Sequence, residues 1–107
     1  FVLKPSWGYG GKGVILGKHM SSDDWKEAVY KYGMDSSWIA QEYVEIPKIE
    51  IPVINKGHVE IGSKYFNLSP YVFGGTYAGC LGRISDSPVI NVSAGGGIIP
   101  VIKEEEN

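Results

Sequence analysis

The chain has 107 residues, a formal net charge of −2 at pH 7 and a single cysteine, Cys80. This length suits one domain over residues 1–107, and the mild acidity gives no electrostatic basis for binding nucleic acid or an anionic membrane. A lone cysteine excludes an internal disulfide, and no apolar run approaches the length of a membrane span. We therefore expect a cytoplasmic protein without nucleic-acid or membrane partners.

The first pattern along the chain is a glycine-rich turn between two predicted strands, residues 1–4 and 13–17. Glycines can adopt positive φ angles and turn several N–H groups toward one anion, and lysines before and within the turn add positive charge. The pattern predicts a phosphate-binding flap between antiparallel strands. Its residues are Lys4, Gly8, Tyr9, Gly10, Gly11, Lys12 and Gly13.

The alternative is a plain hairpin turn that carries ordinary surface lysines. Neither a P-loop nor a dinucleotide-binding turn fits, because each opens a helix and the residues after Gly13 favour a strand.

A helix is predicted over residues 23–32. Ser21 and Ser22 are suitable N-caps, and Gly33 offers a stop. An apolar stripe at helical spacing predicts one face packed on a sheet, formed by Trp25, Ala28, Val29 and Tyr32.

Residues 38–44 are predicted as a third strand, buried at its start. Its end carries a carboxylate, an amide and backbone groups that can bind the edges of an adenine: Gln41, Glu42, Tyr43 and Val44. The alternative is that these are outward-facing residues of an amphipathic strand.

Further strands are predicted in the second half of the chain. Residues 49–54 and 58–61 suggest a hairpin around 55–57, with Pro47 and Pro52 keeping its first arm at an edge. The remaining segments are 71–73, 77–84, 89–92 and, after a glycine run, the apolar 98–102. One main helix with many strands predicts an α+β fold built on an antiparallel sheet.

Arg83 is the only arginine in the chain, and its planar fork suits bidentate recognition of phosphate. The alternative is an ion pair with Asp86 or Glu42. Asn91 and Ser93 are predicted to alternate on one face of a strand. The glycine loop beyond them, including Gly95 and Gly96, offers N–H donors for an oxyanion.

Four strings in this order make the chain resemble the ATP-grasp superfamily, most closely its circularly permuted branch: FVLKPSWGYGGKGVILG, WIAQEYVEIP, FNLSPYVFGG and GRISDSPVINVSAGGG. The resemblance covers nearly the whole chain and implies an incomplete ATP-grasp-like domain. It implies that Lys4 binds nucleotide phosphate, that the flap closes over it, and that residues 41–44 clamp the adenine.

The activity implied is ATP-dependent ligation of a carboxylate to an amine or thiol through an acylphosphate. Arg83 would act as a catalytic residue that offsets charge on the phosphoryl oxygens. Asn91, Ser93, Gly95 and Gly96 would lie near the acceptor substrate. The alternatives are a degenerate nucleotide-binding or interaction module without catalysis, and a plain β-rich domain.

Two departures from the family pattern stand out. Related permuted sequences carry Asp and Arg where this chain has Asn67 and Ser69, although Asn67 still stands at a nucleotide-binding position. No obvious carboxylate pair is present for Mg²⁺, so only Asn91 is left as a weak metal ligand. The resemblance therefore implies the carboxyl-terminal part of a larger ligase. Its expected partners are ATP, Mg²⁺, carboxylate and amine substrates, the remaining half of the parent protein, and a second copy paired through a sheet edge.

Overall fold

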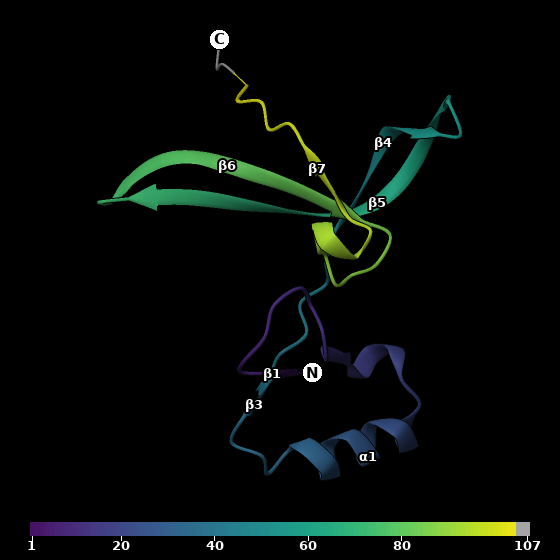
Figure 1. Cartoon of the computed structure of the whole chain (residues 1–107), viewed down its shortest axis with the longest axis vertical. Helices are drawn as coiled ribbons and strands as arrows, with labels where there is room; N and C mark the ends of the chain where they lie inside the picture. Colours follow the sequence, from purple (N-terminus) through teal and green to yellow (C-terminus); the bar gives the residue numbers. More distant parts are fainter. Residues whose placement is uncertain (105–107) are drawn as a thin grey trace. The chain divides into compact units, whose positions relative to one another are not determined.

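The computed structural model describes residues 1–104, and only the backbone of Ala94. Within them the fold is α+β and mostly strand, with one α-helix and two antiparallel sheets of three and four strands (Figure 1). The predicted α+β class is confirmed, although the strands form two antiparallel sheets rather than one. The chain divides into two compact units, Phe1–Glu45 and the segment from Ile46 onward, with one sheet each. A single domain over residues 1–107 stays a prediction.

The first unit surrounds a small sheet of order β2-β1-β3. Leu3 on the central strand faces Ile15 on one side and Ala40 on the other, and Leu3 is one of the few buried apolar side chains. The predicted antiparallel pairing around the glycine flap is confirmed. The elements of this unit are β1 (Val2–Pro5), β2 (Ile15–Leu16), η1 (Gly17–His19), α1 (Ser22–Tyr32) and β3 (Trp38–Gln41).

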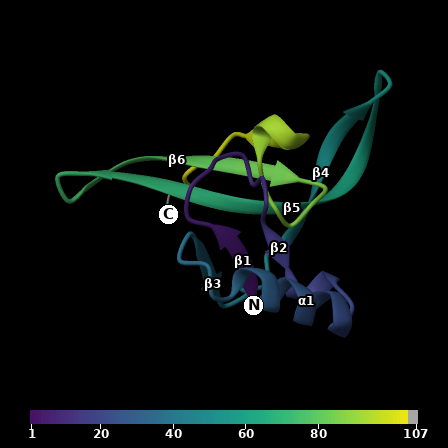
Figure 2. The same ribbon diagram turned by 60° about the horizontal axis from the view of Figure 1, so that its bottom comes forward.

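Helix α1 begins and ends where local signals predict. The Ser21 hydroxyl accepts a hydrogen bond from the backbone N–H of Asp24 at 3.1 Å, and Gly33 donates its N–H to Val29 O at 2.7 Å. Tyr32 stacks on Trp38 with ring centroids 3.9 Å apart, which ties the end of the helix to the start of β3. Figure 2 labels both elements on the ribbon. The predicted apolar stripe is only partly correct. Val29 is exposed, whereas Ala28 is buried.

Removing the N-cap of α1 should destabilise the first unit. We expect Ser21→Ala to lower its free energy of unfolding by about 1 kcal/mol, because the N–H of Asp24 loses its acceptor. All three tryptophans, Trp7, Trp25 and Trp38, belong to this unit, so urea unfolding followed by tryptophan fluorescence reports on it selectively. An unchanged midpoint would contradict a stabilising role for the cap. Ser36→Ala is the control, since Ser36 lies outside the helix.

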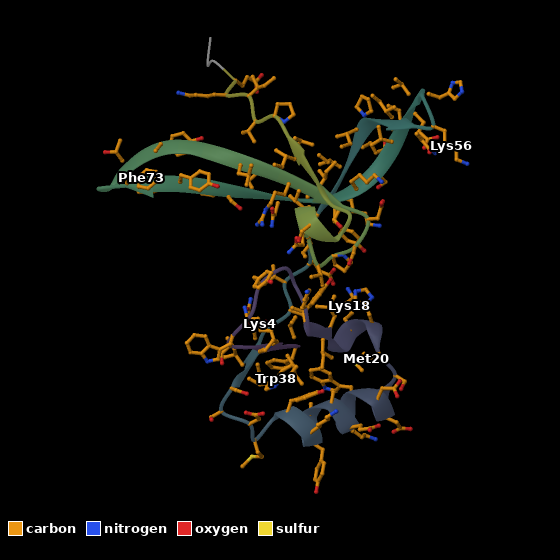
Figure 3. The ribbon with its side chains drawn as sticks, viewed as in Figure 1. Lys4, Lys18, Met20, Trp38, Lys56 and Phe73 are labelled. Carbon is orange, nitrogen blue, oxygen red and sulfur yellow. The ribbon has the colours of Figure 1, made fainter. Side chains whose placement is uncertain are left out.

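The second unit is a sheet of order β4-β5-β6-β7. The predicted hairpin closes through a two-residue turn, Lys56 and Gly57, at φ 48° and 83°. Strand β5 continues for 16 residues and includes the separately predicted 71–73. Figure 3 labels Lys56 and Phe73 at the tips of the two arms that result. The elements are β4 (Lys48–Asn55), β5 (His58–Phe73), β6 (Thr76–Ser85), η2 (Val92–Ala94) and β7 (Gly97–Ile99).

One predicted strand is absent, and others are shorter than predicted, such as β2 with two residues instead of 13–17 and β7 with three instead of 98–102. Residues 89–92 form no strand, because the Asn91 side chain accepts the backbone N–H of Ser93 at 2.8 Å and begins the short helix η2. Strand β3 ends at Gln41 rather than Val44, and Ile39 near its start is 48% exposed instead of buried.

Alternation along β4 and β5 separates the two faces of the second sheet. Register places Ile49 opposite Lys64, and Asn67 opposite Arg83. Since successive residues point to opposite faces, Lys64 and Phe66 lie on one face, and Asn67 with Arg83 on the other. Half-buried Ile49 shares the face of Lys64. None of the helices in the described part of the chain is long and apolar enough to cross a bilayer.

Candidate functional site

The flap between β1 and β2 has the backbone that its glycines predict. Gly8, Gly10, Gly11 and Gly13 have φ angles of 137°, 75°, 70° and 77°, a region that side chains with a Cβ rarely occupy. The chain therefore curls tightly at four positions within six residues. Such a turn can aim backbone N–H groups inward.

Both flap lysines line the same hollow, of about 150 Å³. Pockets for drug-sized ligands occupy roughly 300–1,000 Å³, so this space suits one or two phosphate groups rather than a whole nucleotide. The Lys12 ammonium lies 5.8 Å from the centroid of the Tyr9 ring, near the outer limit of a cation–π contact. The lining residues are Lys4, Pro5, Gly8, Tyr9, Gly11, Lys12 and Val14.

Neighbouring strands bring Lys4 together with Gln41, a residue predicted to bind adenine. Lys4 Nζ donates a hydrogen bond to Gln41 Oε1 at 2.5 Å across β1 and β3. The amide oxygen is neutral, so it orients the ammonium without cancelling its charge. Lys4 thus presents an oriented positive charge at the hollow.

The rest of the predicted adenine segment follows β3 as irregular chain. Glu42 and Val44 are exposed, while Tyr43 is half-buried. The Tyr43 ring lies 5.4 Å from Lys18 Nζ and edge-on to His19 at 6.3 Å. Lys18 also forms an ion pair with Glu45. These contacts hold the Tyr43 ring against η1.

The turn that leads into β3 depends on an ionised carboxylate. Asp35 Oδ1 accepts the backbone N–H of Ser37 at 2.8 Å and its hydroxyl at 2.6 Å. These two hydrogen bonds, the one from the Ser37 side chain first, hold the pKa of Asp35 below its usual value of 3.8. The carboxylate thereby fixes the start of the strand that carries Gln41.

This lowered pKa gives a pH dependence with a defined sign. Because the unfolded chain takes up the proton of Asp35 at higher pH than the folded chain, the contribution of Asp35 is complete well above pH 3.8. It is lost as the pH falls through the lowered pKa. We expect the stability difference between the protein and Asp35→Asn, measured by tryptophan fluorescence, to be largest near pH 7 and to shrink below about pH 4. A difference constant from pH 7 to pH 3 would contradict this.

In the second unit, Arg83 is held by two neutral oxygens. Its Nε donates to Asn67 Oδ1 and its Nη2 to Ser69 Oγ, each at 3.2 Å. The predicted alternative of an ion pair with Asp86 is wrong, since Asp86 pairs with Lys64 instead. Asn67 and Ser69 are therefore the residues that orient Arg83.

The predicted acceptor-substrate residues gather around η2, but not as a strand face. Asn91 Oδ1 accepts from both the N–H and the hydroxyl of Ser93, and Asn91 O accepts the N–H of Gly96 at 2.9 Å. Gly95 adopts φ 87° at the end of η2. Gly95 and Gly96 line a second hollow, described below, whereas Asn91 and Ser93 are engaged with each other.

The described side chains do not fit a magnesium site. Among residues 1–104, no three His, Cys, Asp or Glu side chains come together as a possible metal group. The Asn91 side-chain oxygen already accepts two hydrogen bonds. We therefore derive no step through a metal.

Sequence reasoning missed Lys64. It lines a hollow of about 220 Å³ in the second unit and pairs with Asp86. One signal was available: Lys64 stands two residues from Phe66, on the face that alternation assigns to apolar residues. A lysine on an otherwise apolar face needs a hydrogen-bond or ion-pair partner.

Comparisons with protein-family models, with curated proteins and with solved structures each give no match for this chain.

Proposed function

We propose that this chain binds ATP through the flap of its first unit, as an incomplete domain of the circularly permuted ATP-grasp kind. The observation that carries the proposal is the shared hollow, which Lys4 and Lys12 line together with flap glycines at positive φ. Two lysines and a curled backbone are the donor set that a polyphosphate requires.

The charge of the flap supports the choice of an anion. Lys4 donates a hydrogen bond to the neutral Gln41, and Lys12 lies over the Tyr9 ring, so neither contact neutralises the charge of a lysine. A hydrogen bond from a charged group contributes about 1.5–3 kcal/mol, so two lysines suffice for measurable affinity. Tyr9, which lines the hollow, is 85% exposed, so its flat ring is accessible beside the proposed phosphate position.

We further propose that the parent protein is an ATP-dependent carboxylate–amine ligase. A carboxylate oxygen of one substrate attacks the γ-phosphorus and releases ADP, and an amine then attacks the acyl carbon and releases phosphate. Arg83 would offset charge on the transferred phosphoryl oxygens. Two neutral hydrogen-bond partners support this role of Arg83. Asn67 and Ser69 orient the guanidinium without neutralising its charge, which stays available for a ligand. The proposed residues near the acceptor substrate are Asn91, Ser93, Gly95 and Gly96. The parent enzyme is proposed to be cytoplasmic.

One observation favours the second candidate, a nucleotide-binding module without catalysis. The oxygen of Asn67, proposed as a nucleotide contact, is engaged with Arg83. In this alternative Arg83 is a structural link between β5 and β6. The two candidates differ in turnover by the full-length parent protein and agree on binding by this chain.

Isothermal titration of the folded chain tests the binding proposal. ATP, ADP and adenosine are titrated separately, with and without Mg²⁺. We expect ATP and ADP to bind more tightly than adenosine, because adenosine lacks the phosphate groups that the hollow would hold. Equal affinity for ATP and adenosine would contradict recognition by the flap lysines, and so would an absence of heat in a chain shown to be folded.

A further inference from the structure

The second unit contains a hollow that lies outside the proposed ATP site, although Gly95 and Gly96, two of the proposed acceptor-side residues, line it. It encloses about 220 Å³, larger than the hollow under the flap. Its walls combine apolar side chains, one lysine and a glycine loop. The lining residues are Val53, Lys64, Ile84, Ser85, Asp86, Gly95, Gly96 and Gly97.

Among the residues that the structure describes, Lys64 is the only cationic one that lines this hollow, and its side chain is 22% exposed. Its Nζ lies 2.5 Å from Asp86 Oδ1, whose own side chain is 77% exposed. The pair is therefore asymmetric, with a sheltered ammonium and a carboxylate in solvent. Because an exposed carboxylate remains well hydrated, exchanging it for another carboxylate carries a small cost.

We propose that this hollow binds the carboxylate of a small organic acid, with Lys64 as the recognition residue. The ligand carboxylate takes the position that Asp86 Oδ1 now occupies beside Lys64 Nζ, and Asp86 turns outward into solvent. The side chains of Val53 and Ile84 provide an apolar wall for the rest of the acid. That wall favours an organic acid over an inorganic anion.

The site is separate from the Arg83 cluster. Residues 64 and 67 of β5 differ by an odd number of positions, so Lys64 and Asn67 point to opposite faces of the sheet. Arg83 lies on the face of Asn67. The proposed carboxylate site beside Lys64 can therefore be tested independently of phosphate binding by Arg83.

The glycine loop forms one wall of the hollow. A Cβ at Gly96 would lie 2.5 Å from Asn91 O and 2.8 Å from Ile84 O, so the loop packs directly on the end of β6. Its amides are therefore close reporters for a ligand in the hollow, and three consecutive residues, Gly95 to Gly97, line it.

The test is an NMR titration of the full chain with sodium butyrate at constant ionic strength, without nucleotide. We expect the amide resonances of Gly95, Gly96 and Gly97 to shift saturably. Lys64→Met should weaken binding about tenfold or more, because the charged donor is lost. Asp86→Asn should strengthen it about two- to fivefold, because the competing carboxylate is removed. Lys26→Met is the matched control, since Lys26 also pairs with an aspartate, Asp23, at 3.2 Å but in the first unit.

Each outcome decides the proposal. Binding that Lys64→Met leaves unchanged, or no saturable shift at these glycines, would overturn it. An equal response to inorganic phosphate would overturn the assignment to organic acids. If Lys64→Met fails to fold, Asp86→Asn decides alone, and unchanged affinity in that variant counts against the site.

Discussion

Replacing Lys4 by methionine is expected to weaken ATP binding by about 10- to 100-fold, which corresponds to one lost charge-assisted hydrogen bond. Methionine keeps a long apolar stem at this half-buried position on β1, so the packing beside Leu3 is retained. The ammonium that Gln41 orients toward the hollow is lost. Isothermal titration of the variant with ATP measures the effect.

The control for Lys4→Met is Lys26→Met, on the exposed side of α1. It removes the same charge from the same unit, so a general electrostatic effect would weaken ATP binding in both variants. We expect an effect on affinity only from Lys4. If the Lys4→Met protein is folded and binds ATP as tightly as the unaltered chain, the flap hollow is not the phosphate site.

Substituting Gly96 by alanine should destabilise the second unit by about 1–3 kcal/mol or more. An added Cβ would lie 2.5 Å from Asn91 O and 2.8 Å from Ile84 O, and both are backbone atoms that cannot swing away. Relief requires a shift of η2 or of the end of β6. Since the second unit contains no tryptophan, urea unfolding is best followed by the NMR amide signals of β5 and β6.

Gly97→Ala is the matched control, one residue further on. Its Cβ would meet only side-chain atoms of Ile84, the nearest at 3.4 Å, which is close to ordinary van der Waals contact. We expect a loss of stability well below that of Gly96→Ala. Equal stability of the two variants would show that the loop does not pack on Asn91 and Ile84 as described.

Local signals predicted the first unit well. The Ser21 cap and the Gly33 stop define α1, and the glycines of the flap fix the turn between β1 and β2. Each of these signals acts within a few residues, so the sequence contains the information. The sequence also predicted that Lys4 and Lys12 lie near each other, because a short flap between paired strands brings both to the same side of the flap.

Features that depend on pairing across the sheet were harder to predict. The apolar residues of 89–92 suggested a strand, but the hydrogen bonds of Asn91 to Ser93 favour η2. The 16-residue length of β5 arises because β4 pairs with its first part and β6 with its second. The position of Lys64 on the face of Ile49 is known only from the strand register, which pairs the two residues. Such choices are set by partners distant in sequence.

The most direct test of nucleotide binding by the flap is an NMR titration of the folded chain with ATP, read at the amides of the flap. We expect saturable shifts at Gly8, Gly10, Gly11 and Gly13. These shifts should be larger than those at the Lys56–Gly57 turn, which shares the positive φ but lies outside the proposed site. Flap amides that stay unmoved at saturating ATP, in a chain whose spectrum is that of a folded protein, would contradict nucleotide binding by this flap.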